Sequence, residues 1–172
     1  MQGLSIPDNA WLAVQVRRGY EGMASASLRE KGYEAFLPMR TRQNDWEHRY
    51  SKQVAPLFPG YLFCRYLKEL RSPILTSPGV VRIVGAGNSL SIVEEQEIDS
   101  VRRLAESGMV GEPCPGDRVG RKVRLNSGPL CGVIGTILQV KDHNYVVVGV
   151  AALGRYVAIT VSADWIITDL DG

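Results

Sequence analysis

The chain has 172 residues, 45% of them apolar and 22% charged, which is ordinary for a soluble globular protein with room for two small domains. Its net charge of +2 is too small to indicate a nucleic-acid-binding protein by itself, and no uninterrupted apolar run approaches the ~18 residues of a membrane span. The three cysteines, Cys64, Cys114 and Cys131, contain no Cys-x-x-Cys pair, which argues against a zinc site or a disulfide framework.

The first predicted element is a strand at Trp11–Val16, whose nearly continuous apolar run is typical of a central strand covered on both faces. The period then changes to that of a helix over residues 21–31, which Gly32 is suited to end. Residues 33–42 return to an extended pattern, and Pro38, which lacks a ladder donor, predicts an edge strand there.

Positive charge is concentrated in the first part of the chain. Residues 1–71 carry eleven Lys and Arg against seven Asp and Glu, whereas residues 72–106 carry three against five. The excess lies chiefly in and beside a polar segment, residues 41–52, for which we expect an exposed loop or hairpin. Its basic residues are Arg40, Arg42, Arg49 and Lys52.

The segment 57–63, Leu-Phe-Pro-Gly-Tyr-Leu-Phe, is the most informative part of the sequence. In the strand that follows its Pro-Gly turn, Tyr61 and Phe63 point to one face, and Leu62 and Cys64 point to the other. If the second pair faces the core, the first pair offers an exposed aromatic surface of the kind that anchors a protein partner. A strand buried on both faces fits the same spacing, so both interpretations stay open.

A further strand is predicted over residues 80–84, after the turn residues Ser72, Pro73, Pro78 and Gly79. Residues 91–94 have the spacing of a capping box, and apolar residues at helical intervals follow up to Ala105. We therefore predict an α+β first domain, residues 1–106, with an antiparallel sheet and helices packed on a face.

The residues after 106 have a different character. Glycines and prolines with little apolar content predict a linker over residues 107–115. Short β-branched strands then follow to the end of the chain, so we predict an all-β second domain, residues 116–172, in the form of a small closed SH3-like barrel. Its expected strands span residues 122–125, 133–140, 145–150, 156–161 and 165–168.

The residue types that carry catalysis are poorly represented. His48 and His143 have no recognised metal-ligand spacing, and Cys131 has no readable base nearby. Gly85-Ala86-Gly87 lacks the further residues of a dinucleotide or phosphate loop. We therefore expect no catalytic residues, no metal and no cofactor. No charged-then-apolar leader opens the sequence, which predicts a cytoplasmic protein without a membrane partner.

At this point the sequence resembles the NusG-type transcription elongation and antitermination factors, a family that includes specialised paralogues of the RfaH type and the antiterminators of polysaccharide operons. The resemblance extends over almost the whole chain. In the predicted second domain it takes the form of a KOW motif, with an exposed Gly-Pro turn. The residues that carry it are Trp11–Val16, residues 58–63, residues 79–81, residues 116–119, residues 127–130 with Gly132 and Gly135, and residues 153–155.

The resemblance implies a non-enzymatic protein whose first (NGN) domain docks on the clamp helices of the largest catalytic subunit of RNA polymerase. The family positions that supply the docking surface match Phe58, Pro59, Tyr61 and Phe63. The basic segment would then lie near upstream or non-template DNA, with salt-dependent phosphate contacts and base stacking. The residues implied are Arg40, Arg42, Trp46, Arg49, Tyr50 and Lys52.

The second domain departs from the general factor of the family, which has phenylalanine where this chain has Leu130 and Leu153. That surface contacts a small-subunit ribosomal protein or the termination helicase Rho, so both partnerships are in doubt. The departure favours a specialised paralogue, which we expect to act as a monomer. The β-branched residues of the second domain separately predict that this domain stays β. Two other hypotheses remain, a general factor linking polymerase to Rho or the ribosome, and an RNA-binding KOW protein.

Overall fold

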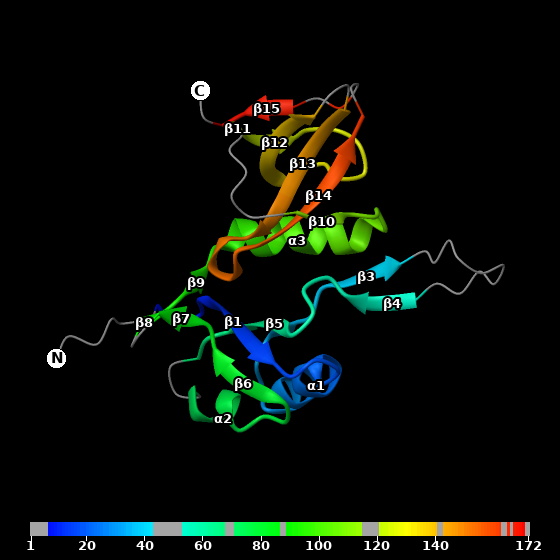
Figure 1. Cartoon of the computed structure of the whole chain (residues 1–172). Coiled ribbons are helices and arrows are strands. Elements are labelled where there is room, and N and C mark those ends of the chain that lie inside the picture. The colour runs from blue at the N-terminus through cyan, green and yellow to red at the C-terminus, as the bar shows by residue number, and fades with distance from the viewer. Residues whose placement is uncertain are drawn as a thin grey trace. The chain divides into compact units, whose positions relative to one another are not determined.

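The structure is a computed structural model of the chain, and it describes residues 7–42, 53–67, 71–86, 89–114, 121–140, 143–162, 165 and 167–170. It divides into two compact units (Figure 1). The first unit comprises Met1–Met39 and Ala55–Glu94, and the second comprises Arg40–Val54 and Glu95–Gly172. Each unit has its own sheet and its own buried residues, and each is described by itself.

The sheet of the first unit is antiparallel and is centred on β1 (Trp11–Val16), as its apolar run predicts. On one side β1 pairs with β5 (Tyr61–Arg65), which pairs with the edge strand β2 (Ala35–Phe36). On the other side β1 pairs with β6 (Val80–Ile83) and with β9 (Ile92–Val93). The predicted edge position of the segment before Pro38 is therefore confirmed.

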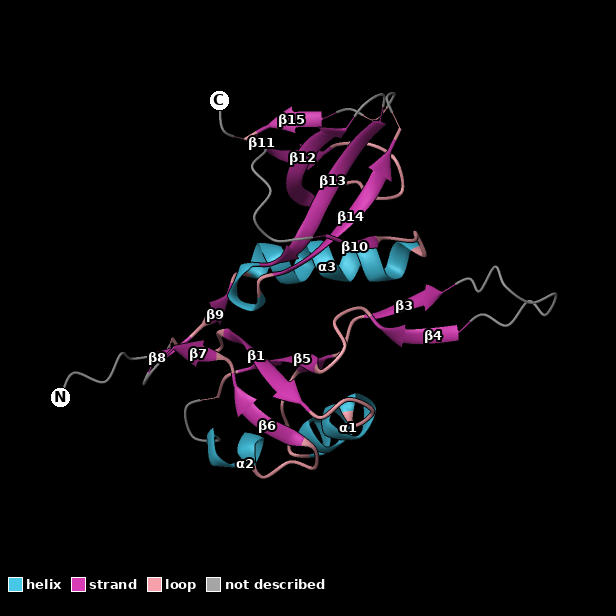
Figure 2. Ribbon diagram, viewed as in Figure 1, coloured by secondary structure: helices cyan, strands magenta, loops and turns pink. Residues whose placement is uncertain are grey.

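One face of this sheet packs against two helices, α1 (Glu21–Glu30) and α2 (Arg71–Leu75) (Figure 2). Leu12, Val14, Leu62 and Cys64 from the sheet join Ala24 and Leu28 of α1 and Ile74 of α2 in one buried cluster. The sequence predicts α1 but not α2, which begins beside Pro73. Proline is tolerated in the first turn of a helix, so a residue that reads as a turn also fits there.

Two two-stranded sheets also precede α3 in the described part of the chain. β3 (Met39–Arg42) pairs with β4 (Gln53–Pro56), which is the pairing that a hairpin over the basic segment requires. The residues between these two strands, 43–52, lie outside the described residues. β7 (Gly85–Ala86) pairs with β8 (Ser89–Leu90), a short ribbon that the sequence pattern does not predict.

The second unit contains an antiparallel sheet in the order β10-β14-β13-β12-β11-β15. The five predicted strands of the second half are all present within two residues of their expected bounds. They are β11 (Arg121–Leu125), β12 (Ile134–Val140), β13 (His143–Val150), β14 (Arg155–Val161) and β15 (Ile167–Asp169). An α+β part followed by an all-β part is therefore confirmed as the fold class.

The predicted linker contains one further strand, β10 (Glu112–Cys114), which pairs with β14 at the edge of the sheet. Pro113 suits that place, because an edge strand needs ladder donors on one side only. The expectation of a linker is wrong for these three residues. The sequence pattern does not indicate this strand, because an edge strand buries little side-chain area and needs few apolar residues.

The helix predicted from the capping-box spacing is α3 (Glu95–Ser107), and it packs against the sheet of the second unit (Figure 1). Ser100 Oγ accepts the N–H of Ile134 at 3.0 Å, and Glu97 Oε1 accepts the N–H of Ala151 at 2.8 Å. Arg103 donates to the carbonyl of Cys131 at 3.0 Å. The contacts thus divide the chain before α3, whereas the sequence pattern predicts the division after it.

Gly128 forms a tight turn in the second unit. Its φ is +80°, and a Cβ added there would lie 2.6 Å from Cε2 of the Trp165 indole. Gly154 also has a positive φ, +57°, but an added Cβ would meet nothing within 4 Å. A substitution at Gly154 would therefore cause backbone strain alone, whereas one at Gly128 would add a collision with the Trp165 ring.

We expect Gly128→Ala to lower the free energy of unfolding of the second unit by about 2–4 kcal/mol, through left-handed strain and displacement of the Trp165 ring. The matched Gly154→Ala change retains the strain alone and should cost about 1–2 kcal/mol. Urea denaturation followed by Trp fluorescence and circular dichroism measures both values. Equal losses of unfolding free energy in the two variants would show that the Trp165 ring moves aside without cost.

Candidate protein-docking site

The strand register separates the side chains of the first unit into two faces. Tyr61 lies opposite Gln15, Phe63 opposite Ala13, and Arg65 opposite Trp11, so these side chains share one side of the sheet. Leu62 and Cys64 point to the other side, into the cluster beneath α1. The predicted alternation of the two pairs is therefore confirmed. We call the side with Trp11, Phe36, Phe58, Tyr61 and Phe63 the aromatic face.

Most rings of the aromatic face form a continuous series of contacts. Trp11 and Phe36 meet edge-to-face with centroids 6.5 Å apart, and Phe36 stacks on Phe63 at 6.1 Å. Phe58 meets Phe63 edge-to-face at 6.1 Å. Aromatic pairs at these separations contribute roughly 0.5–1.5 kcal/mol beyond the area they bury. The series makes the aromatic face a packed layer rather than a set of loose rings.

Burial within this layer corrects one expectation. Phe63 is 0% exposed and Phe58 is 4% exposed, so the prediction that their rings form an open surface is wrong. The reason is the contact of Phe63 with both Phe36 and Phe58, together with its place opposite the small side chain of Ala13. Tyr61 is half-buried and Pro59 is exposed, so these two are the accessible ones among the four expected docking residues.

The sequence pattern did not single out Trp11 or Phe36 as members of this face. The position of Trp11 could be predicted, because neighbouring residues of a strand point to opposite faces and Leu12 faces the helices. Phe36 had no such signal, because β2 spans two residues and its pairing with β5 joins positions that are far apart in sequence.

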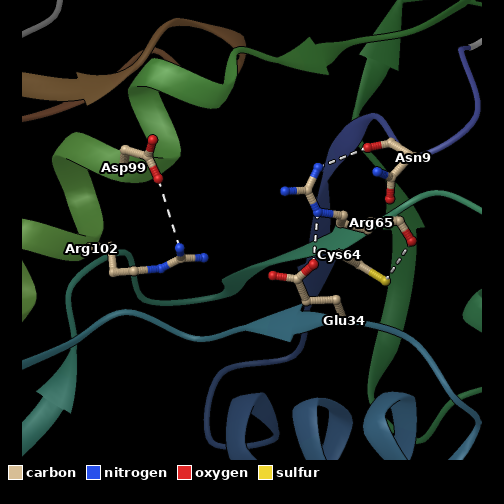
Figure 3. Close-up of polar contacts among 6 residues, drawn as sticks. All are labelled: Asn9, Glu34, Cys64, Arg65, Asp99 and Arg102. Atoms are coloured by element: carbon tan, nitrogen blue, oxygen red, sulfur yellow. Dashed lines mark hydrogen bonds and ion pairs between the residues drawn. The ribbon is translucent and has the colours of Figure 1, made fainter.

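Arg65 lies over one end of the aromatic face. Its guanidinium carbon is 4.6 Å from the centroid of the Trp11 ring, a cation–π geometry. Its Nε donates to Glu34 at 2.7 Å, and another nitrogen donates to the Asn9 carbonyl at 3.0 Å (Figure 3). At the other end, Arg82 donates to the side chain of Gln15, the cross-strand neighbour of Tyr61, at 2.8 Å.

The docking turn, Phe58 to Tyr61, leads into β5. The N–H of Tyr61 donates to the carbonyl of Phe58 at 3.0 Å, and Gly60 has a φ of +84°. Pro59 at the second position and a positive φ at the third are the features of a type II turn. The carbonyl of Gly60 accepts the N–H of Val16 at 2.8 Å, which ties the turn to the end of β1.

A buried carboxylate supports the docking turn from below. Glu21, the first residue of α1, is 5% exposed. Its Oε1 accepts the N–H of Gly60 at 2.9 Å, and its Oε2 accepts the N–H of Gly19 at 2.6 Å. The sequence pattern indicates only that Glu21 complements the helix dipole, because its contact with Gly60 spans 39 positions.

The thiol of Cys64 is unsuited to chemistry. It is 0% exposed, and burial raises its pKa to about 12, with a smaller contribution from the charge of Glu34. Its sulfur lies 3.5 Å from the carbonyl oxygen of Arg65 (Figure 3). A thiol with this pKa stays protonated near neutral pH, so it is neither a nucleophile nor a metal ligand there.

The described part of the chain contains no group of three or more His, Cys, Asp and Glu residues arranged to hold a metal ion. Among its helices, none combines the length and the apolar character that crossing a membrane requires.

Most of the residues expected to contact DNA cannot be placed. Trp46, Arg49, Tyr50 and Lys52 lie outside the described residues, and of Arg42 the structure describes only the backbone, in β3. Arg40 is half-buried, and its guanidinium donates to the carbonyl of Gly111 at 3.5 Å within the second unit. An arginine used in this way presents less of its charge to a phosphate.

The leucines expected on a partner surface of the second unit differ in exposure. Leu130 is 0% exposed, so its expected surface position is wrong. The turn that follows Gly128 folds this side chain inward, with the N–H of Val133 donating to the Leu130 carbonyl at 3.0 Å. Leu153 is half-buried in the short 3-10 turn Ala151–Leu153. The loops of both leucines include the groups that bond α3, Cys131 and Ala151.

Comparisons with known proteins agree on one family. The family model "Transcription termination factor nusG" matches residues 9–102, which is more than half of the chain. The transcription termination/antitermination protein NusG of Vibrio vulnificus is 26% identical over 169 residues, covering 87% of this chain and 90% of the relative. The NusG protein of Staphylococcus epidermidis is 24% identical over 172 residues, covering 91% and 93%.

A solved structure described as "Domain interaction in Thermotoga maritima NusG" is similar in fold, with a TM-score of 0.55 and 22% identity. The similarity covers 95% of this chain and 98% of that structure. It therefore extends over both the α+β part and the β part.

The contrast between Phe63 and Tyr61 gives a prediction. Phe63→Ala removes a fully buried ring and should lower the free energy of unfolding of the first unit by about 3–5 kcal/mol. Tyr61→Ala removes a half-buried ring and should cost about 1–2 kcal/mol. Guanidinium denaturation of both variants measures the difference. A Phe63→Ala protein as stable as Tyr61→Ala would contradict the packed aromatic face.

Proposed function

Because the chain belongs to the NusG family of transcription termination and antitermination factors, we propose that it binds RNA polymerase and promotes transcript elongation. The proposed contact is between the docking turn and the clamp helices of the largest catalytic subunit. The observation that carries this assignment is the turn itself, in which exposed Pro59 and half-buried Tyr61 stand beside a layer of packed rings.

The four residues that the family resemblance implies take two roles in this proposal. Pro59 and Tyr61 contact the polymerase, and an aromatic side chain buries roughly 150–250 Å² when fully covered. Phe58 and Phe63 hold the two contact residues in place from within the aromatic face. A contact that is ordered before binding costs less entropy when the complex forms, which favours affinity at a small interface.

The proposed effect on transcription is mechanical. A protein that binds the clamp and bridges the cleft of the polymerase would hold the clamp closed, suppress pausing and raise processivity. It would act by binding alone, as a non-enzymatic factor, and a role on RNA polymerase implies a cytoplasmic location. Upstream or non-template DNA is a further partner in this proposal, through the basic residues between Arg40 and Lys52.

Within the family, we propose a factor specialised for particular operons rather than a general one. The support is the second unit, where Leu130 is buried and Leu153 is half-buried. The loops of both leucines are engaged by Arg103 and Glu97 of α3. A partner such as Rho or a small-subunit ribosomal protein would find little apolar area at these two positions.

The docking turn can be tested by a pull-down with purified RNA polymerase. We expect Tyr61→Ala to reduce retention of the chain about tenfold or more, because a central aromatic anchor typically contributes 2 kcal/mol or more to binding. Tyr156→Ala removes the same ring from a half-buried position in the second unit and should leave retention unchanged. Equal retention of wild type and a folded Tyr61→Ala protein would rule out the docking turn.

The competing functions predict different results in a reconstituted transcription assay. A specialised factor should lengthen transcripts equally with and without Rho, whereas a general factor should shorten them when Rho is present. An RNA-binding protein should instead bind free RNA with a steep salt dependence. Residues 107–172 carry six Lys and Arg against six Asp and Glu, so we expect weak RNA binding, measurable by a filter-binding titration.

A further inference from the structure

The buried carboxylate beneath the docking turn has features of a positioning group. A glutamate in the first turn of a helix usually lies at the surface, where it complements the helix dipole. Glu21 is instead 5% exposed, and the residue before it, Tyr20, makes no side-chain cap bond. Each of the two carboxylate oxygens accepts a backbone N–H from a different loop, that of Gly19 or that of Gly60.

The contact with Gly60 bears on the conformation of the docking turn. In a type II turn the N–H of the third residue is not used by the turn, because the closing bond comes from the fourth residue. Here the closing bond is that of Tyr61 N–H to the Phe58 carbonyl, and Glu21 takes the remaining N–H of Gly60. The buried N–H of Gly60 therefore has its hydrogen-bond partner only when Glu21 is in place.

Glycine makes the alternative conformation accessible. A type I turn would have a φ of about −90° at the third position, and glycine adopts that value as readily as the observed one. An added Cβ on Gly60 would have ordinary contacts, 3.5 Å from the Val16 oxygen and 3.8 Å from Cγ of Arg18, so glycine is not required here by lack of space. The permissive φ of glycine leaves both orientations of the central Pro59–Gly60 peptide open, and the Glu21 carboxylate favours the observed one by accepting the N–H of Gly60.

We propose that Glu21 is a positioning residue for RNA polymerase docking, which fixes the Pro59–Gly60 peptide so that Pro59 and Tyr61 meet the partner together. The inference rests on the proposed function, because the docking turn is the contact it serves. Glu21 does not touch the polymerase in this scheme. It acts through the N–H of Gly60.

The test is a titration of immobilised RNA polymerase with wild type and Glu21→Gln. The glutamine has about the same size, but its NH2 group must face one of the two glycine N–H donors. We expect affinity to fall about tenfold, the equivalent of leaving one buried donor unpaired. The amide resonance of Gly60 in a ¹⁵N spectrum should move at the same time, because its carboxylate acceptor is lost.

Two control variants separate positioning from loss of charge or of stability. Glu30→Gln removes the same charge from the exposed far end of α1 and should bind like wild type. Ser77→Ala removes a buried hydroxyl that accepts from Lys31 at 2.8 Å and donates to the Pro73 carbonyl at 2.9 Å, away from the turn. It should lower the melting temperature of the first unit without a matching loss of affinity.

The outcomes are distinct. Unchanged affinity of Glu21→Gln with a shifted Gly60 resonance overturns the inference and leaves the docking turn intact. Failure of wild type to bind polymerase overturns the proposed function instead, and the positioning role with it. If Glu21→Gln does not fold, Glu21→Asp replaces it, since the shorter side chain keeps the charge but cannot reach both glycines. Undiminished binding by Glu21→Asp would likewise overturn the inference.

Discussion

The central strand β1 is the constraint on which the rest of the first unit depends. Its odd and even positions face different layers, with Leu12 and Val14 in the cluster beneath the helices and Trp11 and Ala13 in the aromatic face. A shift of one residue in its pairing with β5 would exchange the two layers and place Phe63 beneath α1. The small side chain of Ala13 opposite Phe63 also matters, because it leaves room for a ring at the centre of the sheet.

The alternation of residues along a strand predicts to which face a side chain points, but not whether that side chain is exposed to solvent. The pattern of β5 separates Leu62 from Phe63 correctly, because the direction of a side chain follows from the pleat alone. Whether Phe63 reaches solvent depends on Phe36 and Phe58, which come from a two-residue strand and a turn. Leu130 was expected at the surface on the basis of family positions, whereas its local turn decides its burial. Contacts between distant segments, such as Glu21 with Gly60, leave no mark in the local pattern.

The second unit illustrates the same limit at the level of whole elements. Its β-branched strands are evident in the sequence because they bury most of their apolar side chains. In β13 these are Val146, Val148 and Val150 on one face and Val147 on the other. The association of α3 with this sheet is not evident, since its hydrogen bonds come from three polar side chains and reach backbone groups of Cys131, Ala151 and Ile134 at the start of β12. Glu97, Ser100 and Arg103 would suit the exposed face of an ordinary amphipathic helix, although Ser100 is buried.

The placement of the cysteines gives the molecule an internal reporter. Cys131 is exposed, whereas Cys64 lies in the sealed layer beneath α1 with its proton firmly held. An alkylating reagent added to the native chain would therefore modify exposed Cys131 first and half-buried Cys114 more slowly. It would leave Cys64 untouched until the sheet separates from its helices. The rate at which Cys64 is modified would measure how often the first unit opens transiently, without any label added to the protein.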